Sequence, residues 1–349
     1  MDRKLVFAVA LILALIGTPN IAFRVQKVEA TVTIYIKADG SVDPETASIS
    51  RVDNVVYSFE DNINDSIVVQ RDNIVIDGAN FRLQGTGVDQ SKGVDLSDRT
   101  NVTLKSVEVT DFYFGIFLYF SCDNTVTGSN ASNNTWGAFL ADSCDNALTG
   151  NTFLNNEYGI YFHSSNNNTL TGNNASNNTY GILLDGSTNN TFTCNTVSNN
   201  EYGFYFRSSL RLSKNTVFHN VFVDNKEPAR IGSLFTNVWD DGYPSGGNYW
   251  SDYDGTDGNS DGIGDTPYII DMNNQDDYPL MEPWRPPSSI LGDLNGDGIV
   301  DIFDVVTISL AFGSTPLDSS WNRAADLNYD DAVDIFDIVL LAQNFGKTA

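Results

Sequence analysis

The chain has 349 residues, of which 41% are hydrophobic and 18% are charged, and this composition permits a buried core and excludes a disordered polyelectrolyte. Asp and Glu number 45 against 19 Lys and Arg, so the formal net charge is -26 and the phosphate backbone of a nucleic acid would be repelled. The acidic balance suits hard cations, although carboxylates that only keep a surface soluble would give the same charge.

The N-terminal segment, residues 1–30, has the layout of a secretory signal. Arg3 and Lys4 precede an apolar run from Leu5 to Ile16, then come Gly17, Pro19 and small residues, and we expect cleavage after Ala30. The run is shorter than the about 20 residues of a membrane-spanning helix, and no other segment could cross a bilayer. We therefore expect a secreted or cell-surface protein without a membrane span once the signal is removed. An uncleaved anchor is the alternative.

A 22-residue repeat runs through residues 99–208, marked by a glycine at the same place in every block: Gly115, Gly137, Gly159, Gly181 and Gly203. Apolar and polar residues alternate after each glycine, as in a strand, and the stretches between are rich in residues that favour turns. No block holds the ten or so periodic residues that a crossover helix needs. The pattern predicts stacked coils of short strands, a parallel β-helix over residues 31–235.

Stacked coils place equivalent residues about 4.8 Å apart, so the repeat predicts which side chains form ladders. Two internal ladders are expected, formed by Ile160, Ile182 and Phe204 and by Leu140, Phe162, Leu184 and Phe206. Asparagines also recur in register and are expected to bond to the identical amides of neighbouring coils; they are Asn124, Asn146, Asn168 and Asn190, and Asn134, Asn156, Asn178 and Asn200.

The chain has three cysteines, and Cys122 and Cys144 lie one repeat apart. An odd number excludes a complete disulfide framework. Adjacent parallel strands rarely offer disulfide geometry, so we expect a stacked pair of free thiols.

Two segments carry a family resemblance. Residues 155–161 read Asn-Asn-Glu-Tyr-Gly-Ile-Tyr, and residues 246–253 read Gly-Gly-Asn-Tyr-Trp-Ser-Asp-Tyr before the closing Asp-Tyr-Pro-Leu of residues 277–280. In these motifs the chain resembles NosD-like proteins over residues 31–283. The resemblance implies an all-β right-handed parallel β-helix, a fold shared with pectate lyases and other carbohydrate-active enzymes, and it implies function only weakly. The copper role that the NosD name suggests has little support, because two histidines and three methionines form no cluster of soft ligands.

The segment of residues 236–283 is acidic and closes the β-helix. From Asp240 to Glu282 it has 11 acids and no Lys, Arg or His. Its residues 257–265 match much of a calcium loop, with glycine at the sixth position but Tyr268 at the twelfth, where a bidentate ligand is usual. The alternatives are a third calcium site and a loop of Asx turns without metal. The candidate ligands are Asp257, Asn259, Asp261 and Asp265.

A linker of residues 284–289 leads into a small C-terminal module, residues 290–349, in which one loop occurs twice. Oxygen-bearing side chains occupy positions 1, 3, 5, 9 and 12 of each loop and a backbone carbonyl is expected at position 7, which predicts two calcium ions. An apolar stretch of helical length follows each loop, at residues 305–312 and 338–345. The candidate ligands are Asp293, Asn295, Asp297, Ile299, Asp301 and Asp304, and Asp326, Asn328, Asp330, Ala332, Asp334 and Asp337.

This duplicated loop and helix resembles a type I dockerin domain, over residues 290–346. The resemblance implies a calcium-dependent fold that docks onto a cohesin-like partner. It places the partner-binding positions on Ile302, Phe303, Ile335 and Phe336, which are apolar where many dockerins carry hydroxyl groups. Loop 2 has Asp331 where glycine is usual, so we expect weaker calcium binding there. The alternative partner of the module is the protein's own β-helix.

Outward strand positions carry two columns that are candidates for glycan chemistry. Polysaccharide enzymes place an acid or base beside an extended aromatic surface. The aromatic column offers the glycan-binding candidates Phe117, Phe139, Tyr161 and Tyr205, and the next column offers the catalytic candidates His163, Asp185 and Arg207. The alternative is a solvated face with an ion pair and no chemistry.

Two functional classes follow from these features. The first is an extracellular calcium-binding protein that binds polysaccharide and docks through its C-terminal module. The second is a polysaccharide lyase or O-glycosyl hydrolase of a dockerin-assembled complex. The sequence neither names the glycan nor decides between the two classes.

Overall fold

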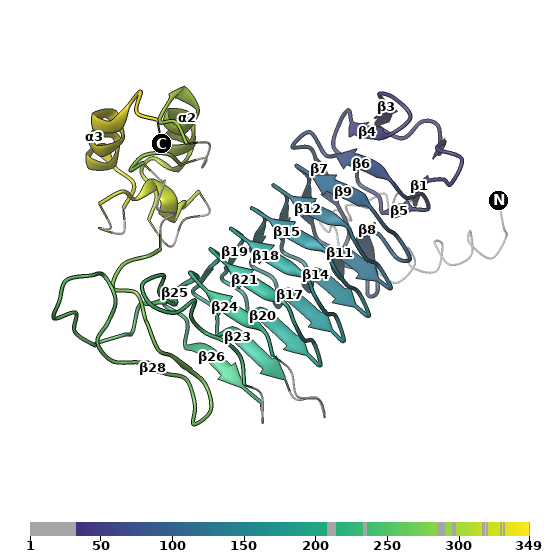
Figure 1. Ribbon diagram of the computed structural model, residues 1–349. Coiled ribbons are helices and arrows are strands. Elements are labelled where there is room, and N and C mark those ends of the chain that lie inside the picture. Colours follow the sequence, from purple (N-terminus) through teal and green to yellow (C-terminus); the bar gives the residue numbers. More distant parts are fainter. Residues whose placement is uncertain are drawn as a thin grey trace, which may run out of the picture.

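The computed structural model describes residues 33–207, 214–232, 236–284, 290–294, 298–315, 318, 320–328, 330 and 332–348. The expected signal, residues 1–30, and all but the first residue of the expected linker therefore lie outside the described residues. The described strands form a stack of coils with three parallel sheets, and the small helical module lies beside the C-terminal end of the stack (Figure 1).

Sheets A, B and C contain the strands of the coils. Within the described parts of these three sheets, neighbouring strands are parallel except for the pairs β1 with β2 and β3 with β4. The spatial order in sheet A is β2 (Val42–Asp43), β1 (Ile34–Ile36), β5 (Ile67–Val69), β8 (Lys92–Asp95), β11 (Phe114–Tyr119), β14 (Trp136–Ala141), β17 (Tyr158–His163), β20 (Tyr180–Asp185), β23 (Tyr202–Arg207) and β26 (Glu227–Ile231). The order in sheet B is β24 (Thr216–Phe218), β21 (Thr191–Thr193), β18 (Thr169–Thr171), β15 (Ala147–Thr149), β12 (Thr125–Thr127), β9 (Val102–Lys105), β6 (Ile74–Asp77), β4 (Val56–Phe59) and β3 (Ile49–Arg51). The order in sheet C is β27 (Tyr249–Trp250), β25 (Val221–Val223), β22 (Thr196–Ser198), β19 (Asn174–Ser176), β16 (Thr152–Leu154), β13 (Asn130–Ser132), β10 (Glu108–Thr110) and β7 (Arg82–Gln84).

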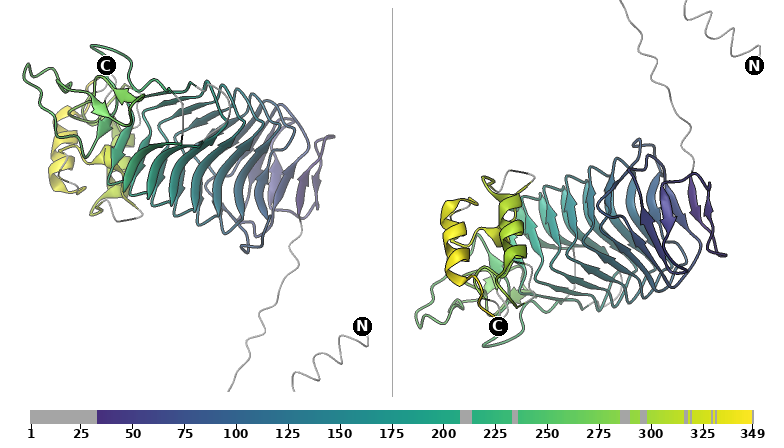
Figure 2. Two further views of the ribbon diagram at one scale, coloured as in Figure 1. Left: turned by 90° about the horizontal axis from the view of Figure 1, so that it is seen from below. Right: turned by 90° about the horizontal axis from the view of Figure 1, so that it is seen from above.

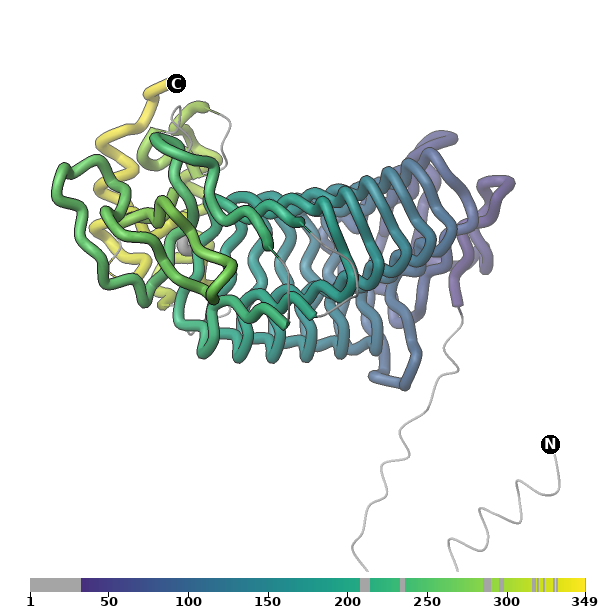
Figure 3. The backbone as a smooth tube through the Cα atoms, turned by 60° about the horizontal axis from the view of Figure 1, so that its bottom comes forward, coloured from purple at the N-terminus to yellow at the C-terminus, as the bar shows by residue number. Residues whose placement is uncertain are grey.

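The register of the sheets follows the 22-residue period. In sheet A, Ile160 pairs with Ile182 and Phe162 pairs with Leu184, and these side chains point into the stack and are fully or almost fully buried. Both predicted internal ladders are thereby confirmed. Because every coil has the same length in this region, the coils superpose along the axis of the stack, as the backbone tube in Figure 3 shows.

The repeat glycine is required by a close approach between coils. A Cβ atom at Gly159 would lie 2.5 Å from the carbonyl oxygen of Gly181, and other glycines of this column meet the same contact. Such a distance is far below normal van der Waals contact, so a larger residue would push the coils apart. The glycine column is thus a packing requirement of sheet A.

Three asparagine ladders cross the interior at the turns. In each ladder, the side-chain oxygen of one asparagine accepts a hydrogen bond from the backbone nitrogen of the asparagine one coil earlier. For example, Oδ1 of Asn146 accepts from the backbone nitrogen of Asn124 at 2.9 Å. The two predicted ladders are confirmed, and a third one was missed. Its members are Asn151, Asn173, Asn195, Asn220 and Asn248.

The expectation of free thiols at Cys122 and Cys144 is wrong, because the two side chains form a disulfide. They lie at isolated bridges outside the named strands, with Cα atoms 4.6 Å apart. The strand geometry that argues against a disulfide does not apply at this position. Cys194, the remaining cysteine, is a half-buried free thiol.

The closing segment continues the β-helix before it leaves it. Strand β27 pairs with β25, and Trp239 and Trp250 bury their indoles against the last coils. A separate hairpin then follows, formed by β28 (Tyr268–Ile269) and β29 (Gln275–Asp276). Residues 236–283 therefore cap the open end of the hydrophobic core.

The C-terminal module contains α2 (Ile302–Ala311), the 3-10 turn η1 (Arg323–Ala325) and α3 (Ile335–Asn344). Both α-helices begin three residues before the predicted stretches of residues 305–312 and 338–345. The reason is a capping box, in which Asp301 or Asp334 is the N-cap and the aspartate three residues later bonds back to it. Figure 2 shows the module next to the C-terminal coils in two further views.

Candidate functional site

The outer face of sheet A carries two columns of mainly aromatic side chains, here called the aromatic strip. Rings of successive coils stack on one another, with centroids 3.9 Å apart for Trp136 and Tyr158 and 5.0 Å apart for Tyr158 and Tyr180. The strip consists of Phe114, Trp136, Tyr158, Tyr180 and Tyr202 in one column and Phe117, Phe139, Tyr161, Leu183 and Tyr205 in the next.

The predicted glycan-binding residues all lie in this strip, but they are less exposed than outward strand positions suggest. Phe117 is 9% exposed and Tyr161 is 8% exposed, because the neighbouring rings cover them. Phe139 and Tyr205 are half-buried. Within the strip the ring faces contact one another, so the surface presents ring edges and phenol hydroxyls.

Charged residues border the strip at both ends. At the N-terminal end, Lys92 Nζ lies 3.9 Å from the ring centre of Phe117 and pairs with Asp95 at 2.7 Å. At the C-terminal end, the guanidinium of Arg230 lies 5.2 Å from the ring centre of Tyr202. Such cation–aromatic contacts add to the packing of the strip.

The three predicted catalytic residues are brought together beside the strip. His163, Asp185 and Arg207 occupy paired positions of three consecutive strands. The Nδ1 atom of His163 lies 3.8 Å from Oδ2 of Asp185, and the hydroxyl of Tyr161 donates to the same oxygen at 3.3 Å. These four residues are called the sheet A cluster. The sequence prediction placed Tyr161 in the aromatic column and missed its contact with Asp185.

The electrostatics of the sheet A cluster keep Tyr161 protonated. Burial and the carboxylate of Asp185 raise the pKa of Tyr161 to about 12, while the guanidinium of Arg207 opposes the rise. Within the described residues Arg207 has no carboxylate in ion-pair range, although Asp185 pairs with it in register. The cluster thus offers a hydroxyl donor, a carboxylate acceptor, an imidazole and a guanidinium on three adjacent strands.

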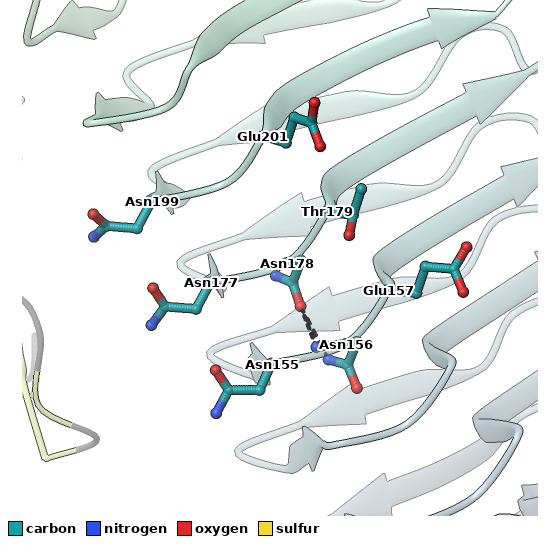
Figure 4. Close-up of a pocket in the computed structure, with 8 residues that line it drawn as sticks. All are labelled: Asn155, Asn156, Glu157, Asn177, Asn178, Thr179, Asn199 and Glu201. Atoms are coloured by element: carbon teal, nitrogen blue, oxygen red, sulfur yellow. Dashed lines mark hydrogen bonds between the residues drawn. The ribbon is translucent and has the colours of Figure 1, made fainter.

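A shallow open pocket of about 560 Å³ lies along the turns between sheets C and A (Figure 4). Glu157, Thr179 and Glu201 form one row of its lining, and Asn155, Asn177 and Asn199 form the next. The buried amide of Asn178 lies behind them and accepts from the backbone of Asn156 at 2.8 Å. The pocket is polar and acidic, and its turns connect directly to the strands of the aromatic strip.

Each predicted calcium loop of the C-terminal module closes on the carboxylate at its twelfth position. Asp304 is fully buried, and its two oxygens accept from the backbone nitrogens of Leu294 at 2.7 Å and Asp301 at 2.8 Å. Asp337 is equally buried and accepts from the second and ninth positions of its own loop at the same distances. In the described part of the two loops, the twelfth residue therefore makes the same two backbone contacts.

The donor set of these loops fits a hard cation. All the predicted ligands are oxygens, and Asp326 at the first position of loop 2 is also fully buried, which favours a bound cation over solvent. Asn295 and Asp297 lie outside the described residues, and in the part that is described no three His, Cys, Asp or Glu side chains gather closely enough to hold an ion. Calcium binding therefore remains a prediction.

Among the other described ligands, Ile299, Asn328 and Asp330 are exposed. Ile299 at the seventh position of loop 1 forms an isolated bridge with Thr348 near the end of the chain. In loop 2, the amide of Asn328 donates to Asp330 at 2.8 Å, and the backbone nitrogen of Ala332 donates to the same carboxylate at 3.1 Å.

The loop of residues 257–265 is held by bonds from its own backbone. Asp257 accepts from the nitrogen of Gly262 at 2.9 Å, and Asp265 accepts from the nitrogen of Gly258 at 2.8 Å. Asp261 accepts from the amide of Asn259 at 2.9 Å. This bonding is the pattern expected of Asx turns, and a third calcium ion stays an untested prediction.

The predicted partner-binding residues begin the two helices of the module and are exposed. Ile302, Phe303, Ile335 and Phe336 have exposed fractions between 56 and 64%. The helices expose further apolar side chains that the sequence prediction did not include, namely Val306, Leu310, Val339 and Phe345.

His219 lies near the end of the stack and is buried. Its Nε2 atom lies 3.0 Å from the carbonyl oxygen of Ser245, and its ring stacks on Trp284 at 4.1 Å. Burial lowers the pKa of His219. The contact fixes the chain where it leaves the closing segment, so the role of this histidine is structural.

Comparison with known proteins agrees with this architecture. Residues 46–255, more than half of the chain, match the family model described as "Periplasmic copper-binding protein (NosD)", and residues 291–346 match the dockerin type I domain. A search of curated proteins finds no match. No helix of the described residues is long and apolar enough to cross a membrane.

Solved structures with a similar fold include two epimerases. The first is a double mutant of the periplasmic alginate epimerase AlgG, with 19% sequence identity, a TM-score of 0.45, and coverage of 50% of this chain and 46% of that chain. The second is the A-module of the mannuronan C-5 epimerase AlgE6 from Azotobacter vinelandii, with 13% identity, a TM-score of 0.30, and coverage of 53% and 63%. The chain spans about half the length of the AlgG structure, and likeness at this level carries no functional argument. On the match over residues 46–255, the chain belongs to the NosD family, and it ends in a type I dockerin domain.

Proposed function

We propose that this protein binds an acidic polysaccharide along the outer face of sheet A. The observation that carries the proposal is the sheet A cluster, in which Arg207 has no carboxylate in ion-pair range among the described residues and its charge acts on the Tyr161 hydroxyl. The half-exposed imidazole of His163 lies two strands away, on the other side of Asp185. A guanidinium without a carboxylate partner is suited to the carboxylate of a uronate residue. The long, regular face next to it would accommodate an extended chain.

The C-terminal module would attach the protein to a larger assembly. The type I dockerin match, the two copied loops and the exposed apolar side chains of α2 and α3 support docking to a cohesin-like partner, with two calcium ions holding the module together. Asp304 and Asp337 would be ligands at the twelfth positions. An extracytoplasmic location is part of this proposal, since both family descriptions fit it. The alternative partner, the protein's own β-helix, is not needed for this function.

A second candidate function is a polysaccharide lyase or hydrolase, and the contact of Tyr161 with Asp185 favours it over passive binding. A phenol that stays protonated can deliver a proton to a leaving oxygen, while the carboxylate holds the phenol in position. His163 is exposed and within reach of the same carboxylate, so it is the group available to take up a proton.

We do not assign copper to this chain. Cys122 and Cys144 are joined in a disulfide. The Nε2 atom of His219 contacts the carbonyl oxygen of Ser245, and the imidazole ring stacks on Trp284. The remaining histidine, His163, has a carboxylate as its neighbour. A copper site needs several nitrogen or sulfur ligands together, and the described residues do not provide them.

The experiment that separates binding from catalysis incubates the full chain with a panel of acidic and neutral polysaccharides. Retardation in gels that contain each glycan measures binding, while new reducing ends and unsaturated products measure turnover. Binding without products supports the first function. Products that disappear in Tyr161→Phe, with binding unchanged, support the second. Retardation by no acidic glycan would overturn the proposal.

A further inference from the structure

Two aromatic side chains stand exposed at the end of β11, outside the aromatic strip. Tyr119 is 40% exposed and Phe120 is 54% exposed, and their ring centroids lie 4.3 Å apart. The rings of the strip itself are buried or half-buried, because neighbouring rings cover them. Tyr119 and Phe120 therefore offer ring surface to a ligand that the strip does not.

Tyr119 belongs to the same column of sheet A as the predicted catalytic residues. It pairs with Ala141 on β14, and Ala141 pairs with His163 on β17. The same register continues over β20 to Arg207 on β23. The ring centroid of Tyr119 also lies 6.2 Å from that of Phe117 in the strip. The Tyr119 side chain thus lies on the outer face of sheet A, in line with Arg207.

The length of this column suits an extended sugar chain. Neighbouring strands are about 4.8 Å apart, so the four steps from Tyr119 to Arg207 span about 19 Å. A sugar ring in an extended chain is about as long as one step, so about five sugars would reach from one residue to the other. Ala141, next to Tyr119, is buried and ends at its methyl group, so no large side chain fills the column there.

Phe120 occupies a backbone position that suits smaller residues. Its φ is 51°, in the left-handed region that bulky side chains rarely adopt. The equivalent residues of the next three coils are Asp142, Ser164 and Gly186, and their φ values are also positive. Because Phe120 is exposed, burial does not offset this backbone strain. Strained positions of this kind cluster at sites that bind ligands.

The charges at this corner determine how a sugar would lie on the two rings. Asp98 and Asp142 occupy the positions equivalent to Phe120 in the coils before and after it, and both are exposed. Their carboxylates would repel the carboxylate of a uronate, whereas the apolar C–H face of a sugar can pack on an aromatic ring. The corner is therefore suited to the sugar ring, and Arg207 is suited to the sugar's charge.

We propose that Tyr119 and Phe120 form an aromatic platform for the polysaccharide, about five sugars along the chain when counted from the sugar that Arg207 holds. The inference rests on the function proposed for sheet A. It adds that the ligand is a linear chain of at least about five sugars, which crosses the strands and runs along the axis of the stack. Shorter chains reach Arg207 but not the platform.

Titration calorimetry of the full chain with trimers and hexamers of oligogalacturonate and oligomannuronate tests the inference. In at least one series the wild type should bind the hexamer about tenfold more tightly than the trimer, because only the hexamer also covers the platform. Tyr119→Ala and Phe120→Ser should each remove most of this advantage and leave the affinity for the trimer unchanged. Arg207→Ala should weaken binding of both lengths.

The fold should tolerate both platform substitutions, because the chain itself carries the new residues at equivalent places. Ala141 stands one coil after Tyr119, and Ser164 stands two coils after Phe120. The free energy of unfolding should not fall in Phe120→Ser, because serine replaces a strained exposed ring. Tyr243→Ala is the matched control, since Tyr243 is 62% exposed but lies in the closing segment, and it should leave both affinities unchanged.

The possible failures of the inference and of the proposed function give different results. If Arg207→Ala weakens binding while Tyr119→Ala and Phe120→Ser bind the hexamer as the wild type does, the platform is overturned and the proposed function stands. Equal losses for trimer and hexamer in Tyr119→Ala would contradict the placement of the platform four strands from Arg207. If the wild type binds no oligouronate of either series, the proposed function fails and the platform fails with it.

Discussion

The carboxylate of Asp276 lies one coil beyond the amide of Asn248 and accepts from the backbone nitrogen of that residue at 2.7 Å. In the coil before, the amide oxygen of Asn248 accepts from Asn220 in the same way, at 3.0 Å. Asp276 is therefore the last acceptor of the third asparagine ladder. It also accepts a hydrogen bond from the indole nitrogen of Trp250 at 2.9 Å. The end of a ladder needs an acceptor but no donor for a further coil, which is what a carboxylate offers.

This position makes the stability of the cap depend on pH. Burial raises the pKa of Asp276 from 3.8 to about 7, so the folded state favours the protonated form. The resulting stabilisation is fully present below about pH 4 and is lost as the pH rises through about 7, by up to about 4 kcal/mol. Chemical unfolding followed by tryptophan fluorescence at pH 4 to 8 measures it. In Asp276→Asn this pH dependence should vanish, and equal slopes for both proteins would contradict the assignment.

A second prediction concerns the interior of the same ladder. The side chain of Asn173 accepts from the backbone of Asn151 at 3.0 Å and donates to the carbonyl of Leu148 at 2.8 Å. Asn173→Ala leaves both buried groups without partners, so the free energy of unfolding should fall by about 3 to 5 kcal/mol. Thr169→Ala, a surface change on a neighbouring strand, should cost less than about 0.5 kcal/mol. Similar losses in both variants would refute a structural role for the ladder.

The inward and outward positions of β17 should respond differently to truncation. Phe162 is fully buried, and Phe162→Ala should lower the free energy of unfolding by about 3 to 5 kcal/mol through the cavity it leaves. His163 next to it has a half-exposed side chain, and His163→Ala should cost less than about 0.5 kcal/mol. Denaturant titration of both variants checks the register, which would be wrong if the two losses were equal.

Calcium binding should depend on the twelfth residue of each loop. The wild-type chain should take up two ions, and Asp337→Ala should lose one of them, because it removes a fully buried carboxylate that also closes loop 2. Asp331→Ala, at the sixth position of the same loop, removes no predicted ligand and should keep both ions. Titration calorimetry measures the stoichiometry. Two ions in Asp337→Ala would remove that residue from the ligand set.

Much of the β-helix could be predicted because its period is constant. Once a 22-residue step is fixed, the inward position of Phe162 and the adjacency of His163 and Asp185 follow without further information. The end of the stack could not be predicted in this way. There the steps lengthen, so Asn248 and Asp276 are 28 residues apart and no repeat points from one to the other.

The remaining differences have local causes. The disulfide of Cys122 and Cys144 depends on corner geometry that the strand pattern does not encode. The low exposure of Tyr161 depends on rings contributed by other coils. The early start of α2 follows from a capping box whose residue Asp301 was assigned only as a metal ligand. The first two differences depend on residues one coil or more away, whereas the third depends on a contact between residues only three apart.

The most direct test of the proposed function measures the affinity of the full chain for an oligouronate by titration calorimetry, in wild type and in Arg207→Ala. Arg82→Ala is the matched control, because Arg82 lies on sheet C and pairs with Glu108 at 3.3 Å. Binding through the sheet A cluster predicts a loss of about tenfold or more in Arg207→Ala, since a charge-assisted bond contributes about 1.5 to 3 kcal/mol, and no loss in Arg82→Ala. An affinity equal in wild type and Arg207→Ala, or no binding by the wild type, would contradict the account.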